Sequence, residues 1–212
     1  MAVRNIFALL LLLCAGAALA LTGAGRSSSP APAKAALPGG TATAIFAGGC
    51  FWCTESDFDH IEGVVSTTSG YIGGRLANPT YEQVSAGNTG HIEAVRVVYD
   101  PRRVSYGTLT QRFFRTIDPT DSGGSFCDRG YQYRSAIFVA NAEERRIAEA
   151  GKALAARQIG RPAATLILPA ARFYPAEAYH QDYYRKNPTR YRFYRWNCGR
   201  DQRLREVWGR AR

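Results

Sequence analysis

The 212-residue sequence has only three histidines and five cysteines, and they are too scattered to form a metal site from paired ligands. A tetrahedral zinc site commonly takes two close pairs of Cys or His, whereas this sequence holds one such pair, the C-x-x-C that begins at Cys50. Thr54 stands where a c-type haem would need a histidine directly after the second cysteine. We therefore expect no metal site and no covalently attached haem.

Acidic residues are also scarce, since 17 Asp and Glu stand against 27 Lys and Arg and give a formal net charge of +10. The basic residues are spread along the chain, are densest near its C-terminal end and are not part of a groove-binding or RNA-binding motif. The charge therefore predicts a solvated basic surface and no nucleic-acid partner. A nucleic-acid binder, whose affinity would fall steeply with salt, is the alternative that the charge alone leaves open.

No apolar run reaches the ~20 residues that a membrane-spanning helix usually needs. The run Ile6–Leu21 follows Arg4 and contains a small-x-small cleavage motif, which is typical of a secretory signal. We predict a signal peptide at 1–20, a flexible linker rich in Ser, Ala, Pro and Gly at 21–40, and one folded domain at 41–212. The protein would then be exported to a bacterial periplasm, without stable membrane insertion after cleavage. An uncleaved N-terminal anchor is the alternative.

The folded part mixes strands and helices without a steady alternation, which favours an α+β fold over a doubly wound sheet. A short β-prone run at 43–47 ends in two glycines, and helical spacing follows at 51–60. Cys50 therefore lies at a strand-to-helix junction. Further strands are predicted at 64–71, 91–99, 131–140 and 164–168, and further helices at 105–117, 141–158 and 176–184.

The C-x-x-C itself favours a redox-active dithiol, because a cysteine at a helix N-terminus has a lowered thiol pKa and Cys53 follows it one turn later. By spacing alone the chain would be a general thiol–disulfide oxidoreductase. Removal of the signal leaves four cysteines, Cys50, Cys53, Cys127 and Cys198. An even number of cysteines in an exported protein is also typical of structural disulfides, so a disulfide-stapled binding module stays open.

Several short motifs follow one another along the chain. They are GCFW after a short strand, GYIGG at 70–74, NPTYEQV at 78–84, GHIEAVRVVYDP at 90–101 and QYRSAIF at 132–138. Together they resemble those of one enzyme family, peptide methionine sulfoxide reductase A, from about residue 45 to about residue 188. The resemblance implies a peptide-methionine (S)-S-oxide reductase that acts on the S-sulfoxide of methionine in proteins, in peptides or free, without metal or organic cofactor. It also implies a ferredoxin-like split βαβ core in a two-layer sandwich, with additional helices and a long irregular C-terminal tail.

The resemblance assigns the reaction chemistry to four residues. Cys50 matches the nucleophile, and Glu93 matches the acid that protonates the sulfoxide oxygen. A sulfoxide sulfur is electrophilic only when its oxygen is protonated or strongly hydrogen-bonded, and burial would keep a carboxyl protonated near neutral pH. Tyr81 and Tyr133 match the phenols that hydrogen-bond the same oxygen.

The same comparison assigns substrate binding to three residues near these four. Phe51 and Trp52 match the pocket for the ε-methyl group of the substrate, which suits two apolar rings beside a thiolate. Asp128 matches a carboxylate beside the site that orients other groups. All three histidines are expected to be structural.

The sequence departs from the family pattern at the cysteines expected to reduce the oxidised enzyme. Catalysis leaves Cys50 as a sulfenic acid, which a second thiol must convert to a disulfide. Cys53 stands where the family usually has glycine, and the tail lacks the common Gly-rich segment with two cysteines. We rank Cys198 first as the resolving cysteine, Cys53 second as resolver or relay, and Cys127 third. The expected partner is a thioredoxin-like dithiol reductant, and we expect a monomer.

Overall fold

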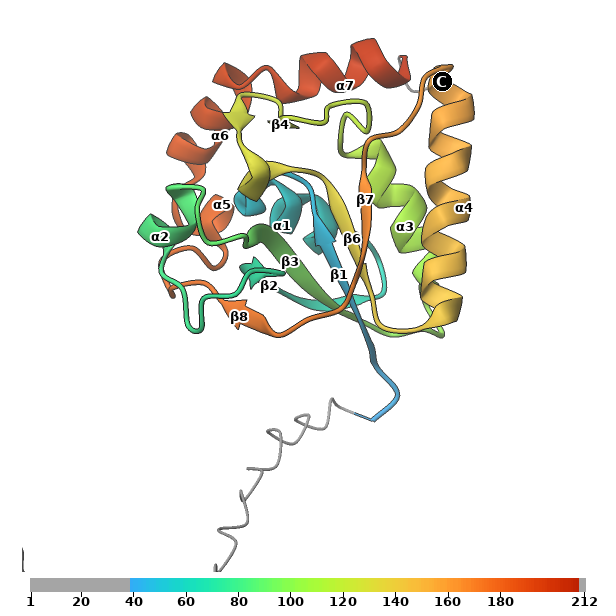
Figure 1. The fold of residues 1–212 in the computed structure, drawn as a ribbon, viewed down its shortest axis with the longest axis horizontal. Helices are drawn as coiled ribbons and strands as arrows, with labels where there is room; N and C mark the ends of the chain where they lie inside the picture. Colours follow the sequence, from blue (N-terminus) through green and yellow to red (C-terminus); the bar gives the residue numbers. More distant parts are fainter. Residues whose placement is uncertain (1–38, 210–212) are drawn as a thin grey trace, which may run out of the picture. The chain divides into compact units, whose positions relative to one another are not determined.

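The structure is a computed structural model that describes residues 39–209 (Figure 1). The predicted signal peptide and nearly all of the predicted linker lie outside the described residues. Between residues 39 and 209, no helix is long and apolar enough to cross a membrane.

A six-stranded sheet forms the centre of the fold, with the strand order β7-β6-β1-β3-β2-β8. The middle strands β6, β1, β3 and β2 pair antiparallel, in the order and with the intervening helices of a ferredoxin-like split βαβ core. β7 pairs parallel with β6 and β8 antiparallel with β2, so both extend the core sheet. The strands are β1 (Ala42–Ala47), β2 (Val64–Ile72), β3 (Ile92–Tyr99), β6 (Ala136–Val139), β7 (Leu166–Pro169) and β8 (Phe173–Pro175), with a separate ribbon of β4 (Gly124–Ser125) and β5 (Asp128–Arg129).

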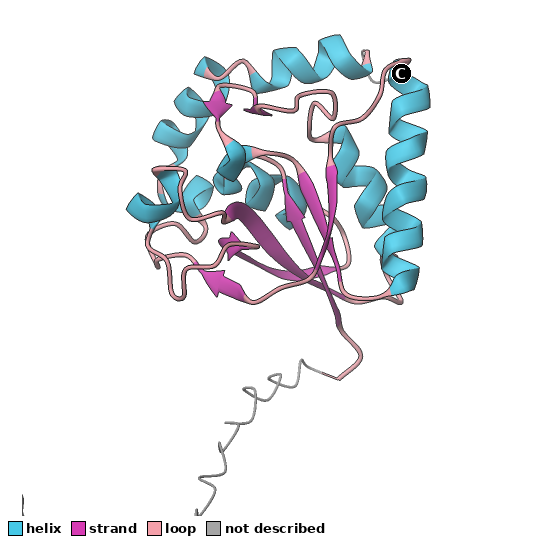
Figure 2. Ribbon diagram, in the orientation of Figure 1, coloured by secondary structure: helices cyan, strands magenta, loops and turns pink. Residues whose placement is uncertain are grey.

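Helices surround this sheet (Figure 2), and several begin at a side-chain cap. Ser105 Oγ accepts the Thr108 N–H at the start of α3, and Asn141 Oδ1 accepts the Glu144 N–H at the start of α4. Such caps satisfy backbone donors that the first turn leaves free. The helices are α1 (Phe51–Asp59), α2 (Tyr81–Ser85), α3 (Tyr106–Arg115), α4 (Ala142–Ile159), α5 (Tyr183–Lys186), α6 (Pro188–Asn197) and α7 (Arg200–Trp208), with a 3-10 turn η1 (Tyr131–Tyr133).

The two faces of the sheet are buried in different cores. Along β1, Phe46 lies in the larger core with α1, α3 and α4, whereas its neighbour Ala47 lies in a smaller core on the other face. This alternation follows from the two-residue period of a strand. In β3, Glu93 has the same parity as Val95 and Val97, which lie in the larger core. Glu93 therefore lies on the face that α1 covers.

The α+β class and the split βαβ core are confirmed, and most predicted elements are present. The predicted strand at 131–140 is wrong in its first half, because Gly130 has a positive φ of 119° and the chain turns through η1 before β6 begins. The predicted helix at 176–184 is wrong up to Asp182, where the backbone is left-handed and α5 starts only at the next residue. The C-terminal tail also contains two helices that the sequence did not predict, α6 and α7.

Candidate active site

Cys50 is the N-cap residue of α1, as the sequence predicts. Gly49 immediately before it has a φ of +85°, and a Cβ built there would lie 2.5 Å from the Cβ of Ser125, so only glycine fits this turn. The Cys50 carbonyl accepts the N–H of Cys53 at 3.1 Å and closes the first turn. The tight turn therefore fixes the Cys50 thiol at the helix N-terminus, where it is buried.

Glu93 lies directly beside this helix start. Its Oε2 accepts the backbone N–H of Phe51 at 3.0 Å, and only 2% of the residue is exposed. Burial raises the pKa of the Glu93 carboxyl to about 8, and the neighbouring Asp128 contributes in the same direction. The carboxyl is therefore mainly protonated at pH 7. Because Oε2 accepts the amide, the proton resides on the other oxygen, Oε1.

Two tyrosines share the surroundings of Glu93. Burial raises the pKa of Tyr81 to about 12, and the charges of Glu93 and Cys50 add to this. Burial also raises the pKa of Tyr133, followed by the charges of Glu93 and Tyr81. Both phenols therefore keep their protons and can donate. Tyr81 is held by Glu177, whose Oε1 accepts the Tyr81 N–H at 2.8 Å.

The aromatic pair after Cys50 takes two different positions. Phe51 is fully buried against the ring of His180 at 4.9 Å, so it belongs to the floor of the site and the core at once. Trp52 is half-buried and stacks on Tyr183 with ring centroids 3.7 Å apart. Its Nε1 donates to His180 Nδ1 at 2.9 Å. Trp52 thus presents a fixed aromatic wall beside Cys50.

His180 belongs to this site, which the sequence analysis missed by treating all three histidines as structural. Because Nδ1 accepts the Trp52 indole proton, the neutral ring carries its own proton on Nε2. That nitrogen is buried and has no hydrogen-bond partner among residues 39–209. Burial lowers the pKa of His180. His91 is structural as expected, since Nδ1 accepts the Gly74 N–H and Nε2 donates to the Leu76 carbonyl.

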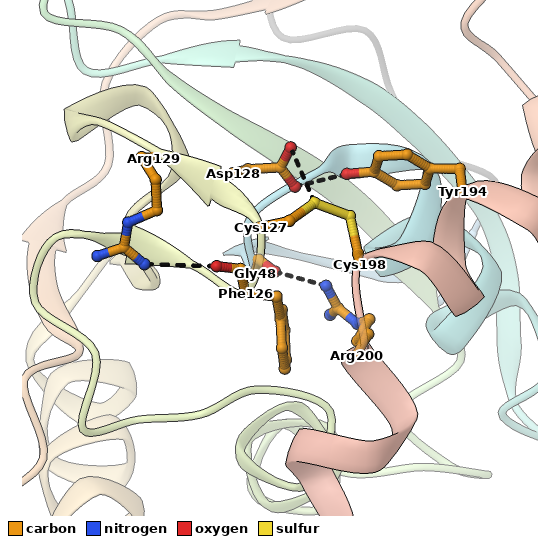
Figure 3. The surroundings of a disulfide bond; sticks show 8 residues. All are labelled: Gly48, Phe126, Cys127, Asp128, Arg129, Tyr194, Cys198 and Arg200. Carbon is orange, nitrogen blue, oxygen red and sulfur yellow. Dashed lines mark hydrogen bonds between the residues drawn. A yellow bond between two sulfur atoms is a disulfide. The ribbon is translucent and has the colours of Figure 1, made fainter.

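Asp128 and Tyr194 connect the site to the C-terminal helices (Figure 3). The Tyr194 hydroxyl of α6 donates to Asp128 Oδ2 at 2.5 Å. Burial raises the pKa of Tyr194, so it stays protonated. The edge of the Tyr194 ring faces Trp52 at 5.7 Å. Tyr194 is a second residue that the sequence analysis missed.

Cys127 and Cys198 form a disulfide with a Cα–Cα distance of 4.9 Å (Figure 3). The bond joins the turn of the β4–β5 ribbon to the C-terminal end of α6. Asp128 Oδ1 lies 3.9 Å from the Cys127 sulfur, so the disulfide borders the site. Cys127 is exposed, whereas Cys50 and Cys53 are buried. In this oxidised state the two sulfurs are not available as metal ligands.

Cys53 is a free thiol on the buried side of α1. The neighbouring Cys50 side chain lowers the pKa of Cys53, and the positive charges of Arg200 and Arg195 add to this, while burial raises the pKa of Cys50. Arg200 is itself fully buried and donates to the Gly48 carbonyl at 3.1 Å. The two thiols therefore interact directly, and the sulfur nearer to the arginines carries more of the negative charge.

A buried thiol pair beside a protonated carboxyl and two donor phenols defines a thiol-dependent oxidoreductase site. The family described as "Peptide methionine sulfoxide reductase" matches residues 42–212. The chain is 54% identical to peptide methionine sulfoxide reductase MsrA 2 of Rhizobium meliloti over 78% of this chain and 83% of the relative. It is 53% identical to MsrA 2 of Caulobacter vibrioides over 80% of this chain and 86% of the relative. The chain therefore belongs to the peptide methionine sulfoxide reductase A family.

Solved structures of this family share the fold. Methionine sulfoxide reductase A of Corynebacterium diphtheriae aligns with a TM-score of 0.64 at 37% identity, covering 71% of this chain and 77% of that chain. Reduced Mxr1 from Saccharomyces cerevisiae aligns with a TM-score of 0.69 at 33% identity, covering 72% and 89%. Mxr1 in complex with Trx2 shares the fold at 24% identity, with a TM-score of 0.51 over 72% of this chain and 91% of that chain.

Proposed function

We propose that the protein reduces the S epimer of methionine sulfoxide to methionine, in oxidised proteins, in peptides or as the free amino acid, and so repairs oxidised proteins. The observation that carries the proposal is the buried Glu93 carboxyl, bonded to the amide that follows Cys50. A general dithiol oxidoreductase needs no protonated carboxyl at this place. Sulfoxide reduction needs a protonated carboxyl, because the sulfoxide oxygen must take up a proton as the thiolate attacks the sulfur.

Cys50 first gives its thiol proton to the neighbouring Cys53, whose thiolate the arginines favour, and the resulting Cys50 thiolate attacks the sulfoxide sulfur. Glu93 supplies a proton to the oxygen, and the Tyr81 and Tyr133 hydroxyls donate hydrogen bonds to it as negative charge develops. The S–O bond breaks, the oxygen passes to the Cys50 sulfur, and methionine is released. Cys50 becomes a sulfenic acid, so the thiol is oxidised by two electrons and the substrate is reduced by two.

Substrate selection follows from the rings around Cys50. The wall of Trp52, fixed by its hydrogen bond to His180 and its stack on Tyr183, is a flat apolar surface for the ε-methyl group. Phe51 closes the floor behind it. Asp128 orients the Tyr194 hydroxyl, which interacts electrostatically with the Cys50 side chain, so these two residues position the sulfur rather than transfer protons.

Resolution of the sulfenic acid is assigned to Cys198. Its thiol attacks the Cys50 sulfur and expels water, and Cys127 then exchanges with Cys198 to give the Cys127–Cys198 disulfide and free Cys50. Cys53 is the competing resolver, supported by its place one helical turn after Cys50 and by the electrostatic interaction between the two thiols. In that route a Cys50–Cys53 disulfide forms first and passes to the exposed cysteine pair.

The reductant and the location complete the proposal. A thioredoxin-like dithiol protein reduces the exposed disulfide. The structure of Mxr1 in complex with Trx2, which shares this fold, supports such a partner. The predicted N-terminal signal supports export to a bacterial periplasm. The enzyme acts as a monomer.

The decisive test is the initial rate at which the purified protein reduces separated S and R epimers of N-acetylmethionine sulfoxide with excess dithiothreitol. We expect reduction of the S epimer alone. Reduction of insulin disulfides, assayed in parallel, should be slow. Failure with both epimers together with rapid insulin reduction would instead establish a general thiol–disulfide oxidoreductase.

A further inference from the structure

Two aromatic side chains on α6 are unusually exposed. Phe193 is 64% exposed and Trp196 74%, more than any other large apolar side chain between residues 39 and 209. They stand one turn apart with ring centroids 6.0 Å from each other, so they form one apolar surface. Each ring left in water forgoes the favourable free energy of burying its apolar surface. An adjacent pair of this kind marks a place where another molecule binds.

The exposed pair lies close to the disulfide at the C-terminal end of α6. The helix ends at Asn197 and Cys198 is its C-cap residue, about 3 Å along the helix axis from Trp196. The Trp196 and Cys198 side chains leave nearly opposite sides of the helix, which is roughly 10 Å wide, so only a partner of protein size spans both. Two hollows adjoin this helix end: one, of ≈ 320 Å³, is lined by Trp196 and Gly199, and the other, of ≈ 430 Å³, is lined by Phe126 and Cys198. A protein that covers the aromatic pair and extends around the helix end would therefore reach the disulfide.

The charged residues of α6 are all positive. Arg190 and Arg192 are exposed, and neither makes an ion pair with any residue in the described part of the chain. Arg195 differs, because it pairs with Asp57 at 2.8 Å and Asp201 at 2.7 Å. α6 itself contains no acidic residue. The surface next to the disulfide thus combines two aromatic rings with two uncompensated positive charges, a composition typical of protein-binding hot spots.

We propose that the α6 patch, defined as Arg190, Arg192, Phe193 and Trp196, is the docking surface for the dithiol protein that reduces the Cys127–Cys198 disulfide. The partner presents an apolar contact area ringed by acidic residues, next to its reactive cysteine. The proposal rests on the proposed function, because that cycle delivers its oxidising equivalents to this disulfide. A second copy of the chain carries the same positive charges and would be repelled, and a lipid surface would not need the disulfide at the edge of the patch.

The reaction at the docked interface balances with the partner as the only reductant. A partner thiolate attacks the exposed Cys127 sulfur, the Cys127–Cys198 bond breaks, and Cys198 leaves as a thiolate that takes up a proton. The second partner thiol then attacks the partner sulfur in the mixed disulfide and releases Cys127. The partner is oxidised to a disulfide, and the enzyme gains two electrons and two protons.

The test compares a protein reductant with a small one on the same enzyme. The variants are F193A/W196A and the charge reversal R190E/R192E, and the matched control is V65A, which truncates an apolar side chain that is 56% exposed on β2. Methionine sulfoxide reduction is driven either by thioredoxin with NADPH and thioredoxin reductase or by dithiothreitol. We expect each double variant to lose at least tenfold in kcat/KM for thioredoxin while its dithiothreitol rate stays at wild type. R190E/R192E should also lose the salt dependence of the thioredoxin reaction.

Failure of the proposed function and failure of the proposed docking surface would give different results. An enzyme that cannot reduce the S-sulfoxide even with dithiothreitol would refute the proposed function. Wild-type thioredoxin kinetics in both double variants, alongside normal dithiothreitol activity, would overturn the docking surface and leave the function intact. Binding to anionic vesicles that is lost in F193A/W196A, with thioredoxin kinetics unchanged, would assign the patch to a membrane and overturn the proposal in the same way.

Discussion

Replacement of Glu93 by glutamine should destroy activity and stabilise the protein at the same time. The amide keeps an oxygen that can accept the Phe51 N–H, which Glu93 Oε2 now accepts at 3.0 Å, so the local packing is preserved. It cannot give up a proton to the sulfoxide oxygen. Loss of a positioned general acid typically lowers a rate by about 10²–10⁴-fold, and we expect a loss of kcat/KM in this range.

The stability change follows from the raised pKa. The carboxyl has an ordinary pKa of 4.5 and a native pKa of about 8, so the stability that the wild-type residue contributes is fully present below pH 4.5 and is lost as the pH rises to 8. At ~1.4 kcal/mol per pH unit, ionisation of the unfolded chain weakens the wild-type protein by roughly 3 kcal/mol at pH 7 and roughly 5 kcal/mol above pH 8. Glutamine does not titrate and avoids this loss.

The assay is urea unfolding followed by tryptophan fluorescence, with the disulfide kept oxidised, at pH 4.5, 7 and 8.5. The difference in unfolding free energy between E93Q and wild type should be near zero at the lowest pH and grow with pH in favour of the variant. E62Q is the matched control, because Glu62 is exposed and pairs only with Arg103, so it should change stability by less than about 0.5 kcal/mol. A stability difference that does not depend on pH, or an E93Q rate within tenfold of wild type, would refute the reasoning.

Three further predictions concern the same site. In wild type, kcat/KM for the sulfoxide should fall as the pH rises through about 8, because Glu93 then loses the proton it must donate; a rate that still climbs above pH 9 would contradict this. C198S should release about one methionine per enzyme and then stall with thioredoxin; if the protein is prepared without residues 1–20, which contain Met1, the single methionine of the sequence, and without an added initiator methionine, the gained oxygen seen by mass spectrometry reports cysteine alone. Sustained turnover would move the resolving role to Cys53. Y194F should lower kcat/KM by roughly tenfold, since it removes the hydrogen bond that holds Asp128 beside the site, without changing the pH at which activity falls.

The part of the fold that could be predicted is the part in which local pattern and tertiary burial agree. β3 alternates between the two cores, and α3 and α4 begin at the Ser105 and Asn141 caps that the sequence displays. α6 could not be predicted from apolar spacing, because Tyr191 is its only buried residue. It is held by polar contacts, of which the Arg195 ion pair to Asp57, 138 residues earlier, is one.

The residues of the candidate site divide in the same way, into those that the nearby sequence indicates and those that long-range contacts bring to the site. The local pattern could place Cys50 at the strand-to-helix junction, whereas Glu93 could be assigned only through the resemblance of its motif to the family. His180 could not, since its only signal is a bond to Trp52 at a separation of 128 residues. The pairing of Cys127 with Cys198 spans 71 residues, and spacing alone leaves three cysteines as candidates.

The C-terminal helices are therefore a working part of the site and not an appendage to it. Arg200 begins α7 two residues after Cys198, and its buried guanidinium donates to the carbonyl of Gly48, at the turn that carries Cys50, and to that of Thr116 at 2.8 Å. It also covers the ring of Phe126, next to Cys127, at 4.4 Å. A buried cation with these partners is costly to displace, so the helix junction stays fixed while sulfur bonds are exchanged beside it. The family's usual Gly-rich tail would bring a resolving cysteine in by flexibility, whereas this chain holds Cys198 at the end of a helix and leaves the exposed Cys127 as the accessible sulfur for the reductant.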